Sequence, residues 1–496
     1  MNSSAPKKPV IYEINTQVWM YELRQMYGNS LTLADVPDEI LAGWQRVGFQ
    51  YIWLMGVWER SPQSKQVSNQ NDAQIAEFLA ALPDFTVDDN IGSAYAVRRY
   101  SVDASLGGNQ AMFILRERLR GFGMHLLLDF VPNHLAKDHD WVTAHPEFFI
   151  QGEAADLLKN GGEFFEAGGK IIAHGKDPFF PPWRDTAQLN IFSPSTRLAA
   201  ANALDEIADL CDGVRCDMAM LCLSEVFQQT WGERAGNIPE KEYWKEMIDA
   251  TRLSHPDFLF LAEAYWDKEN ELLNLGFDAC YDKVLYDRVV KADPAGILQR
   301  LSQEKPPVSH RVMFIENHDE KRVAAALSPL RSIQAAIMLV TLPGYRLFHE
   351  GQIQGRRVRV PVFLRRRVDE KPVHDQERFY QVLIRTSVSP LCQDGEWRLC
   401  RRNGWDDNQS HLNMVAWSWH FQGETLLIVL NLNDLPSQAR ITLPWDDLRG
   451  TEWKLIDLIK GDVFYRSGDE MTGEGVYVDL PGWGFHFLWT RLNPES

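Results

Sequence analysis

Three short stretches of the chain place an acidic residue at the end of an apolar run. Asp217 ends "GVRCD", Glu263 lies in "AEAYW", and Asp319 lies in "ENHDE". A carboxylate that leaves water costs free energy unless it is paired or used in a reaction. Two carboxyl groups in one cleft, one ionised and one protonated, can cleave a glycosidic bond through a covalent intermediate. These three residues are therefore candidates for nucleophilic and acid–base chemistry.

Arg215 lies two residues before Asp217. Side chains two apart on a strand point to the same face, so the guanidinium and the carboxylate should meet. A neighbouring cation favours the ionised carboxylate, whereas a carboxyl group near other carboxylates in a desolvated cleft keeps its proton. We therefore expect Asp217 to be ionised and Glu263 to be protonated. The alternative is that Arg215 and Asp217 form an ion pair with a purely structural role.

Eight apolar segments alternate with helical stretches over the first 350 residues. We interpret each segment as a strand, and the segments are 10–19, 49–57, 124–131, 212–218, 258–266, 276–282, 310–319 and 345–351. Strands that alternate with helices form a parallel sheet. Eight such units predict an α/β protein built on a closed (β/α)8 TIM barrel.

Two further regions depart from this alternation. The interval 134–192 is too long for a simple loop and is rich in glycine, histidine and aromatic residues. After about residue 390 the chain changes to short alternating strands separated by turn residues, which predict a β-sandwich. The expected parts are the first part of the barrel at 1–133, an inserted subdomain after strand 3 at 134–192, the second part of the barrel at 193–390, and a C-terminal all-β sandwich at 391–496.

The carboxyl ends of the strands form the functional face of such a barrel. Asp217, Glu263 and Asp319 stand at the ends of the predicted strands four, five and seven, and His134 follows strand three. His318 stands beside Asp319. Their placement on separate strand ends predicts that these side chains converge at one mouth.

Five motifs together resemble those of the alpha-amylase family of glycoside hydrolases and transglycosidases. They are "DFVPNH" (129–134), "DTAQLN" (185–190), "GVRCD" (213–217), "AEAYW" (262–266) and "ENHDE" (316–320). The resemblance covers the barrel, the insertion and the C-terminal domain. It implies that Asp217 is the nucleophile, Glu263 the general acid/base and Asp319 the stabiliser of the transition state.

The same resemblance assigns roles to the residues around the trio. Arg215 would orient Asp217, and His134 and His318 would bind hydroxyl groups of the sugar at the cleavage point. Asp129 is similar to a structural aspartate of the family, and Tyr95 to the aromatic platform under that sugar. Trp266, three residues after Glu263, either lines the groove toward the leaving group or packs in its wall.

Cation and anion sites are less clearly marked. No obligatory cofactor is expected, but Asn133 resembles a calcium ligand of the family, and calcium takes six to eight oxygen ligands. Met220 and Leu221 stand where family members often have Lys-His, which leaves the binding of the acceptor open.

The run 355–367 holds six arginines. They either pair with nearby acids or bind an anionic group such as a sugar phosphate.

Composition limits the partners. The net charge of −17 argues against a nucleic-acid-binding surface, which needs clustered lysine and arginine. We see no apolar run long enough for a membrane span and no apolar segment of a signal peptide, so we expect a cytoplasmic protein whose partner is a carbohydrate.

The sequence thus predicts a retaining glycoside hydrolase that acts on α-glucosidic bonds of oligosaccharides or α-glucans. A transglycosidase or a sugar phosphorylase of the same family would use the same covalent intermediate, and both remain alternatives. A non-catalytic carbohydrate-binding homologue on the same fold is the alternative from another class.

Overall fold

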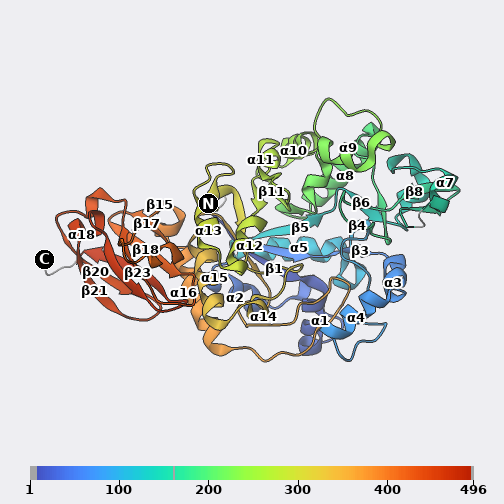
Figure 1. Ribbon diagram of the computed structural model, residues 1–496. Helices are drawn as coiled ribbons and strands as arrows, with labels where there is room; N and C mark the ends of the chain where they lie inside the picture. The colour runs from blue at the N-terminus through green and yellow to red at the C-terminus, as the bar shows by residue number, and fades with distance from the viewer. Residues whose placement is uncertain (1–7, 160–161, 493–496) are drawn as a thin grey trace.

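Eight parallel strands close into a barrel in the computed structural model, which describes residues 8–159 and 162–492 (Figure 1). Around the barrel the order is β1, β14, β13, β12, β11, β10, β5 and β2, so β1 pairs with both β2 and β14. The strands are β1 (Val10–Asn15), β2 (Tyr51–Met55), β5 (His125–Phe130), β10 (Gly213–Cys216), β11 (Leu259–Ala262), β12 (Ala279–Tyr281), β13 (Arg311–Met313) and β14 (Tyr345–His349). The predicted TIM barrel is confirmed, with each strand inside its predicted segment.

The first strand is shorter than the predicted 10–19. It stops at Asn15, whose side-chain oxygen accepts a hydrogen bond from the backbone nitrogen of Val18 at 3.4 Å. This side chain caps helix α1 (Thr16–Tyr27). The apolar residues after Asn15 therefore continue as a helix, since the cap changes the backbone direction before the apolar pattern ends.

Helices surround the barrel and follow the strands in the chain. The longer ones are α2 (Asp38–Val47), α5 (Gly108–Gly121), α8 (Pro194–Ala208), α9 (Ser224–Trp231), α10 (Tyr243–Ser254), α12 (Lys283–Lys291), α13 (Pro294–Leu301), α15 (Pro329–Thr341) and α16 (His374–Ser387). None of the helices in the described part of the chain has the length and apolar character needed to cross a bilayer. All six cysteines are buried and unpaired.

The interior of the barrel changes from apolar to charged along the strands. Ile11 is part of an apolar cluster inside the barrel, and so is Leu127. Two residues further along the same strands stand Glu13 and Asp129, which face the same side and are buried. Arg215 on β10 is buried as well. The mouth of the barrel therefore carries charges that the floor lacks.

Two inserted segments lie on the side of the barrel away from the C-terminal domain (Figure 1). The first contains β3 (Trp58–Arg60), α3 (Pro62–Asn69), α4 (Asp72–Ala81) and β4 (Val97–Val102). The second contains β6 (His134–Ala136), α6 (Asp140–Ala144), α7 (Ala154–Lys159), β7 (Phe164–Ala167), β8 (Lys170–Ala173) and β9 (Thr186–Gln188). β6 and β9 pair antiparallel, so the second segment leaves and returns at the same edge.

The C-terminal part is all-β, as predicted. β15 (Glu396–Leu399), β17 (Met414–Phe421), β18 (Glu424–Asn431), β20 (Glu452–Asp457), β21 (Val463–Ser467) and β23 (Phe485–Leu492) form a six-stranded sheet. β16 (Arg401–Asn403), β19 (Ser437–Thr442) and β22 (Val476–Leu480) form a three-stranded one. Both sheets are antiparallel. The exact boundaries of the four parts stay predictions.

Two tryptophans of β17 attach this domain to the barrel. The Trp419 indole nitrogen donates to the backbone oxygen of Thr341 at 2.6 Å, and that of Trp417 donates to the Thr341 hydroxyl at 3.2 Å. Both rings are fully buried. The contact thus combines apolar burial with satisfied polar groups, which favours a fixed attachment.

We expect Trp419→Ala to lower the free energy of unfolding by about 3–5 kcal/mol, because it leaves a large cavity and an unpaired carbonyl. Urea denaturation followed by circular dichroism measures this loss. Trp405→Ala, at a ring that is 37% exposed, is the matched control and should change stability by less than about 0.5 kcal/mol. Equal effects of the two substitutions would contradict the assignment.

Candidate active site

A cavity of about 630 Å³ opens at the carboxyl ends of the barrel strands. All three acidic residues of the predicted trio, Asp217, Glu263 and Asp319, line it. Asp217 and Glu263 directly follow β10 and β11, and Asp319 lies in the loop after β13. Tyr95 and His134 also line the cavity. The structure therefore brings together side chains that lie more than 200 residues apart in the chain.

The Arg215 guanidinium joins two of the acids. One of its nitrogens lies 2.6 Å from Asp217 Oδ1, and another lies 2.8 Å from Glu263 Oε2. All three side chains are buried. Since both carboxyl groups bind one small planar cation, they must lie side by side at the mouth. The expected contact of Arg215 with Asp217 is present, and the contact with Glu263 adds to it.

Burial acts on the proton affinity of both carboxyl groups. It raises the pKa of Glu263; the charge of Arg215 opposes the rise, and the nearby Asp217 and Asp319 add to it. Burial also raises the pKa of Asp217, against the charge of Arg215 and its hydrogen bond. Burial and the two neighbouring carboxylates thus favour a proton on Glu263, and its protonated state stays a prediction. Asp217 has the direct hydrogen bond from Arg215 that an attacking anion needs.

Asp319 is kept ionised by a different partner. Its Oδ2 lies 3.0 Å from His318 Nε2, and its side chain is 47% exposed toward the cavity. Burial alone would raise the pKa of Asp319, but the positive charge and hydrogen bond of His318 lower it to about 2. Asp319 is therefore a fixed negative charge beside Asp217 and Glu263.

His134 is in the opposite state. Burial lowers its pKa to about 4, so the ring is neutral near pH 7. It begins β6, and its ring packs against Trp183 with centroids 4.9 Å apart. The "DTAQLN" motif reaches it through β9, where Gln188 is paired in register with His134. A neutral imidazole can both donate and accept hydrogen bonds, which suits a sugar hydroxyl group.

Tyr95 and Asp129 frame the charged centre. The Tyr95 ring stacks on His318 with centroids 5.4 Å apart, and the Arg215 guanidinium lies 5.2 Å from its centre. Asp129 accepts hydrogen bonds from the backbone nitrogen of Gly56 at 2.8 Å and from the Trp53 indole at 3.2 Å. Asp129 therefore ties neighbouring strands together, in agreement with a structural role.

Trp266 was expected either to line the groove or to pack in its wall, and it is not among the residues that line this cavity. The residue is 37% exposed and its ring meets Phe179 edge-on, with centroids 4.9 Å apart. Tyr265 lines the cavity instead, and its hydroxyl donates to Glu263 Oε1 at 2.8 Å. The signal was available, because Tyr265 stands two residues after Glu263 and shares its side of an extended chain.

The first inserted segment forms part of the cavity wall, which the sequence did not predict. Asn71 and Gln74, from the turn into α4 and from α4 itself, line the cavity together with Phe363. Phe363 belongs to the arginine-rich run, whose backbone bonds to the inserted segment through Ile91 at 2.8 Å. The wall is thus built from two loops that are nearly 300 residues apart in the chain.

The arginines of 355–367 bind groups within the chain. Arg366 contacts Asp84 and Asp89, and Arg367 contacts Glu22 and Glu350. Arg359 pairs with Glu77, and Arg356 lies 3.6 Å from Glu22. Arg357 donates to the Ala324 carbonyl, and Arg365 lies 3.9 Å from Asp89. These contacts favour the structural interpretation of the run over recognition of an anionic ligand.

Asn133 was the predicted contributor to a calcium site. Its side-chain oxygen accepts from Gln188 at 2.9 Å, and its side-chain nitrogen lies 3.2 Å from the Gln188 oxygen. Across residues 8–159 and 162–492 no cluster of three or more His, Cys, Asp or Glu residues is placed to hold a metal ion. Calcium binding at Asn133 stays a prediction, and no step below uses it.

Comparisons with known proteins point to alpha-amylases. A sequence model described as the catalytic domain of alpha-amylase matches residues 41–157. The alpha-amylase MalA of Haloarcula japonica is 27% identical over 282 residues, which are 55% of this chain but only 38% of that protein. Over these residues the chain is similar to proteins of the alpha-amylase family.

Solved structures of alpha-amylases share the fold over nearly the whole chain. The maltogenic alpha-amylase AmyB of Thermotoga neapolitana has a TM-score of 0.69 at 18% identity and covers 98% of this chain and 99% of its own. The alpha-amylase of Geobacillus thermoleovorans, in complex with acarbose, has a TM-score of 0.68 at 17% identity and covers 99% of both chains. At this low identity the likeness concerns the fold.

Tyr265→Phe should move the alkaline limb of the pH profile of kcat/KM upward by about half to one unit. Glu263 must be protonated to donate, so activity falls as pH rises through its pKa. The Tyr265 hydroxyl favours the ionised carboxylate, and its removal raises that pKa. Tyr100→Phe is the control, because the Tyr100 hydroxyl binds the Val131 carbonyl. If the alkaline limb of the Tyr265→Phe profile shifts downward or does not move, the Tyr265 hydroxyl does not favour the ionised Glu263.

Proposed function

We propose that this protein is an enzyme of the alpha-amylase family, a retaining hydrolase of α-glucosidic bonds in oligosaccharides or α-glucans. The observation that carries the proposal is the single guanidinium of Arg215, which binds Asp217 and Glu263 side by side at the edge of a cavity that Asp319 also lines. A nucleophile and an acid held this close suit double displacement, since an inverting pair must leave room for water between them.

The first step of the proposed reaction breaks the glycosidic bond. Asp217 attacks the anomeric carbon while Glu263 gives its proton to the departing oxygen, so the leaving sugar departs as an alcohol and a glycosyl–Asp217 ester forms. In the second step Glu263 takes a proton from water, and the resulting oxygen displaces Asp217. Two inversions restore the original anomeric configuration.

The surrounding residues support the sugar during both steps. Positive charge develops on the sugar ring, and the ionised Asp319 opposes it across the cavity. His318 and the neutral His134 offer hydrogen bonds to hydroxyl groups, and Tyr95 offers a flat ring to the apolar face of the sugar. The proteins named above as alpha-amylases support the choice of an α-glucosidic substrate.

Transglycosylation remains the second candidate, because a sugar hydroxyl can replace water in the second step. Phosphorolysis has less support. Each arginine of 355–367 already contacts a carboxylate or a backbone carbonyl of the chain. Products therefore decide between these activities, since the geometry of the first step is common to them.

Asp217→Asn should reduce kcat by about ten-thousand-fold or more, because an amide cannot form the glycosyl ester. Asp212→Asn is the matched control. Asp212 lies just before the other end of β10, bound to Arg116, and its loss should change kcat by only a few-fold. Initial rates on maltooligosaccharides measure both. Full activity of Asp217→Asn would refute the nucleophile and with it the retaining mechanism.

The product test incubates the enzyme with each of five substrates, with and without inorganic phosphate: maltooligosaccharides, maltose, trehalose, sucrose and maltose 1-phosphate. We expect chromatography of the products to show free sugars. Proton NMR at early times should show the α-anomer as the first product, because two displacements retain configuration. A first product with the β-configuration would contradict the mechanism. Longer oligosaccharides would indicate transfer, and sugar 1-phosphates formed only with phosphate would indicate phosphorolysis.

A further inference from the structure

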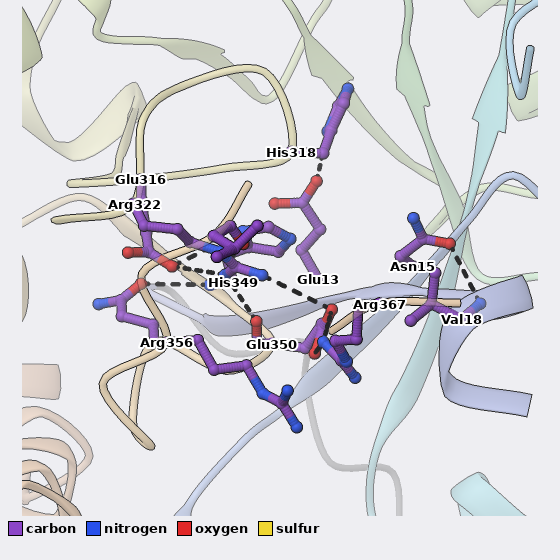
Figure 2. Close-up of polar contacts among 12 residues, drawn as sticks. Glu13, Asn15, Val18, Glu316, His318, Arg322, His349, Glu350, Arg356 and Arg367 are labelled. Carbon is purple, nitrogen blue, oxygen red and sulfur yellow. Dashed lines mark hydrogen bonds and ion pairs between the residues drawn. The ribbon is translucent and has the colours of Figure 1, made fainter. Parts of the chain in front are cut away.

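A buried carboxylate that the proposed reaction does not use lies directly behind the site. Glu13 is on β1, in register with Trp53 on β2 and with His349 on β14, and it is fully buried. Its Oε1 lies 2.5 Å from His318 Nδ1. The Glu13 side chain points to His318 and away from the cluster that Arg322, Glu316 and Glu350 form (Figure 2).

His318 is therefore held at both ring nitrogens. Nδ1 meets Glu13, while Nε2 lies 3.0 Å from Asp319 and 2.9 Å from the Tyr95 hydroxyl. A neutral imidazole has only one N–H, so it cannot donate to carboxylates on both sides. The doubly protonated ring can. With both carboxylates ionised, the two contacts therefore favour the imidazolium.

We propose that Glu13 is a positioning residue that holds His318 as an imidazolium directed at Asp319. The proposal rests on the function proposed above, since it gives that site its charge state. Glu13 touches neither substrate nor reacting atoms, and it acts through His318.

The charge balance of the site shows why a second carboxylate is needed. Burial disfavours the imidazolium, and the charges of Asp319 and Glu13 together raise the pKa of His318 well above its usual value. Asp319 is half exposed to the cavity, so its attraction changes when a sugar enters, whereas Glu13 is shielded on all sides. The charged and titratable groups around His318 are Glu13, Tyr95, Asp129, Arg215, Asp217, Asp319 and His349.

A fixed imidazolium has two consequences for the reaction. The Nε2–H of the imidazolium donates a charge-assisted hydrogen bond to Asp319, and this bond is stronger than one from a neutral ring. It also keeps Asp319 ionised, because its positive charge is the main cause that lowers the pKa of Asp319. The loss of Glu13 would therefore weaken this hydrogen bond and the ionisation of the stabilising carboxylate together.

Glu13→Gln tests the proposal, because it keeps the size of the side chain and removes its charge. At pH 5 His318 is still protonated in the variant, so the kcat/KM of Glu13→Gln should stay within a few-fold of the wild-type value. Once the pKa of His318 falls toward the ordinary value of about 6.5, kcat/KM should drop about tenfold for each further pH unit. Glu13→Asp, which keeps the charge, should recover part of the alkaline activity.

Glu269→Gln is the matched control for a lost buried carboxylate. Glu269 is buried against Arg300 at 3.0 Å and has no contact with His318. Its pH profile should overlay that of the wild type even if its stability falls. A Glu13→Gln profile that also overlays the wild type would overturn the proposal.

A titration of His318 by NMR tests the charge state without turnover. In the full chain labelled with 13Cε1-histidine, the His318 signal is assigned by its absence in His318→Asn. The wild-type signal should stay that of the imidazolium above pH 7, and in Glu13→Gln it should titrate near its ordinary pKa. A wild-type midpoint at or below about 6.5 would overturn the proposal even if Glu13→Gln does not fold. Failure of the retaining mechanism would appear separately, as turnover by Asp217→Asn.

Discussion

The structure depends on one buried cation, the guanidinium of Arg215. It binds Asp217 and Glu263 directly, lies 4.0 Å from Asp129, and faces the rings of Trp53, Tyr95 and Tyr281. Carboxylates so close together repel one another. Without a cation between them, the cost of burying their negative charges away from water would not be offset. The aromatic rings exclude water and offer their negative faces to the same charge. Arg215 thus allows buried carboxyl groups to stand at the carboxyl ends of the strands, above the apolar interior of the barrel.

The two histidines show how position sets charge. His134 is buried beside Trp183, where burial outweighs the attraction of Asp185 for a proton, and it is neutral. His318 is equally buried but stands between Glu13 and Asp319, and these two charges keep it protonated. The resemblance to the family gave both residues the same task. Only the three-dimensional surroundings show that one can accept a hydrogen bond from the sugar while the other can only donate.

The barrel and the acidic trio could be read from the sequence, because apolar strands alternate with helices and each acid stands directly after a strand or in the loop that follows one. What the sequence could not show depends on long-range packing. The role of Glu13 needs the closure of β1 onto β14, and the cavity wall of Asn71, Gln74 and Phe363 needs two distant loops to meet. Tyr265 and Asn15 are different. Their spacing and capping signals were local and could have been recognised.

The wall around α4 is independent of the barrel's hydrogen-bonded strands. Phe78 and Leu82 pack with Val360 and Leu364 in an apolar cluster separate from the main core, and Arg359 pairs with Glu77 across the two loops. Insertions or exchanges in these loops would reshape the far end of the cavity while Arg215 and its carboxylates keep their places. Substrate choice and bond cleavage are therefore modular in this chain, and they can diverge separately in evolution or be exchanged separately by design.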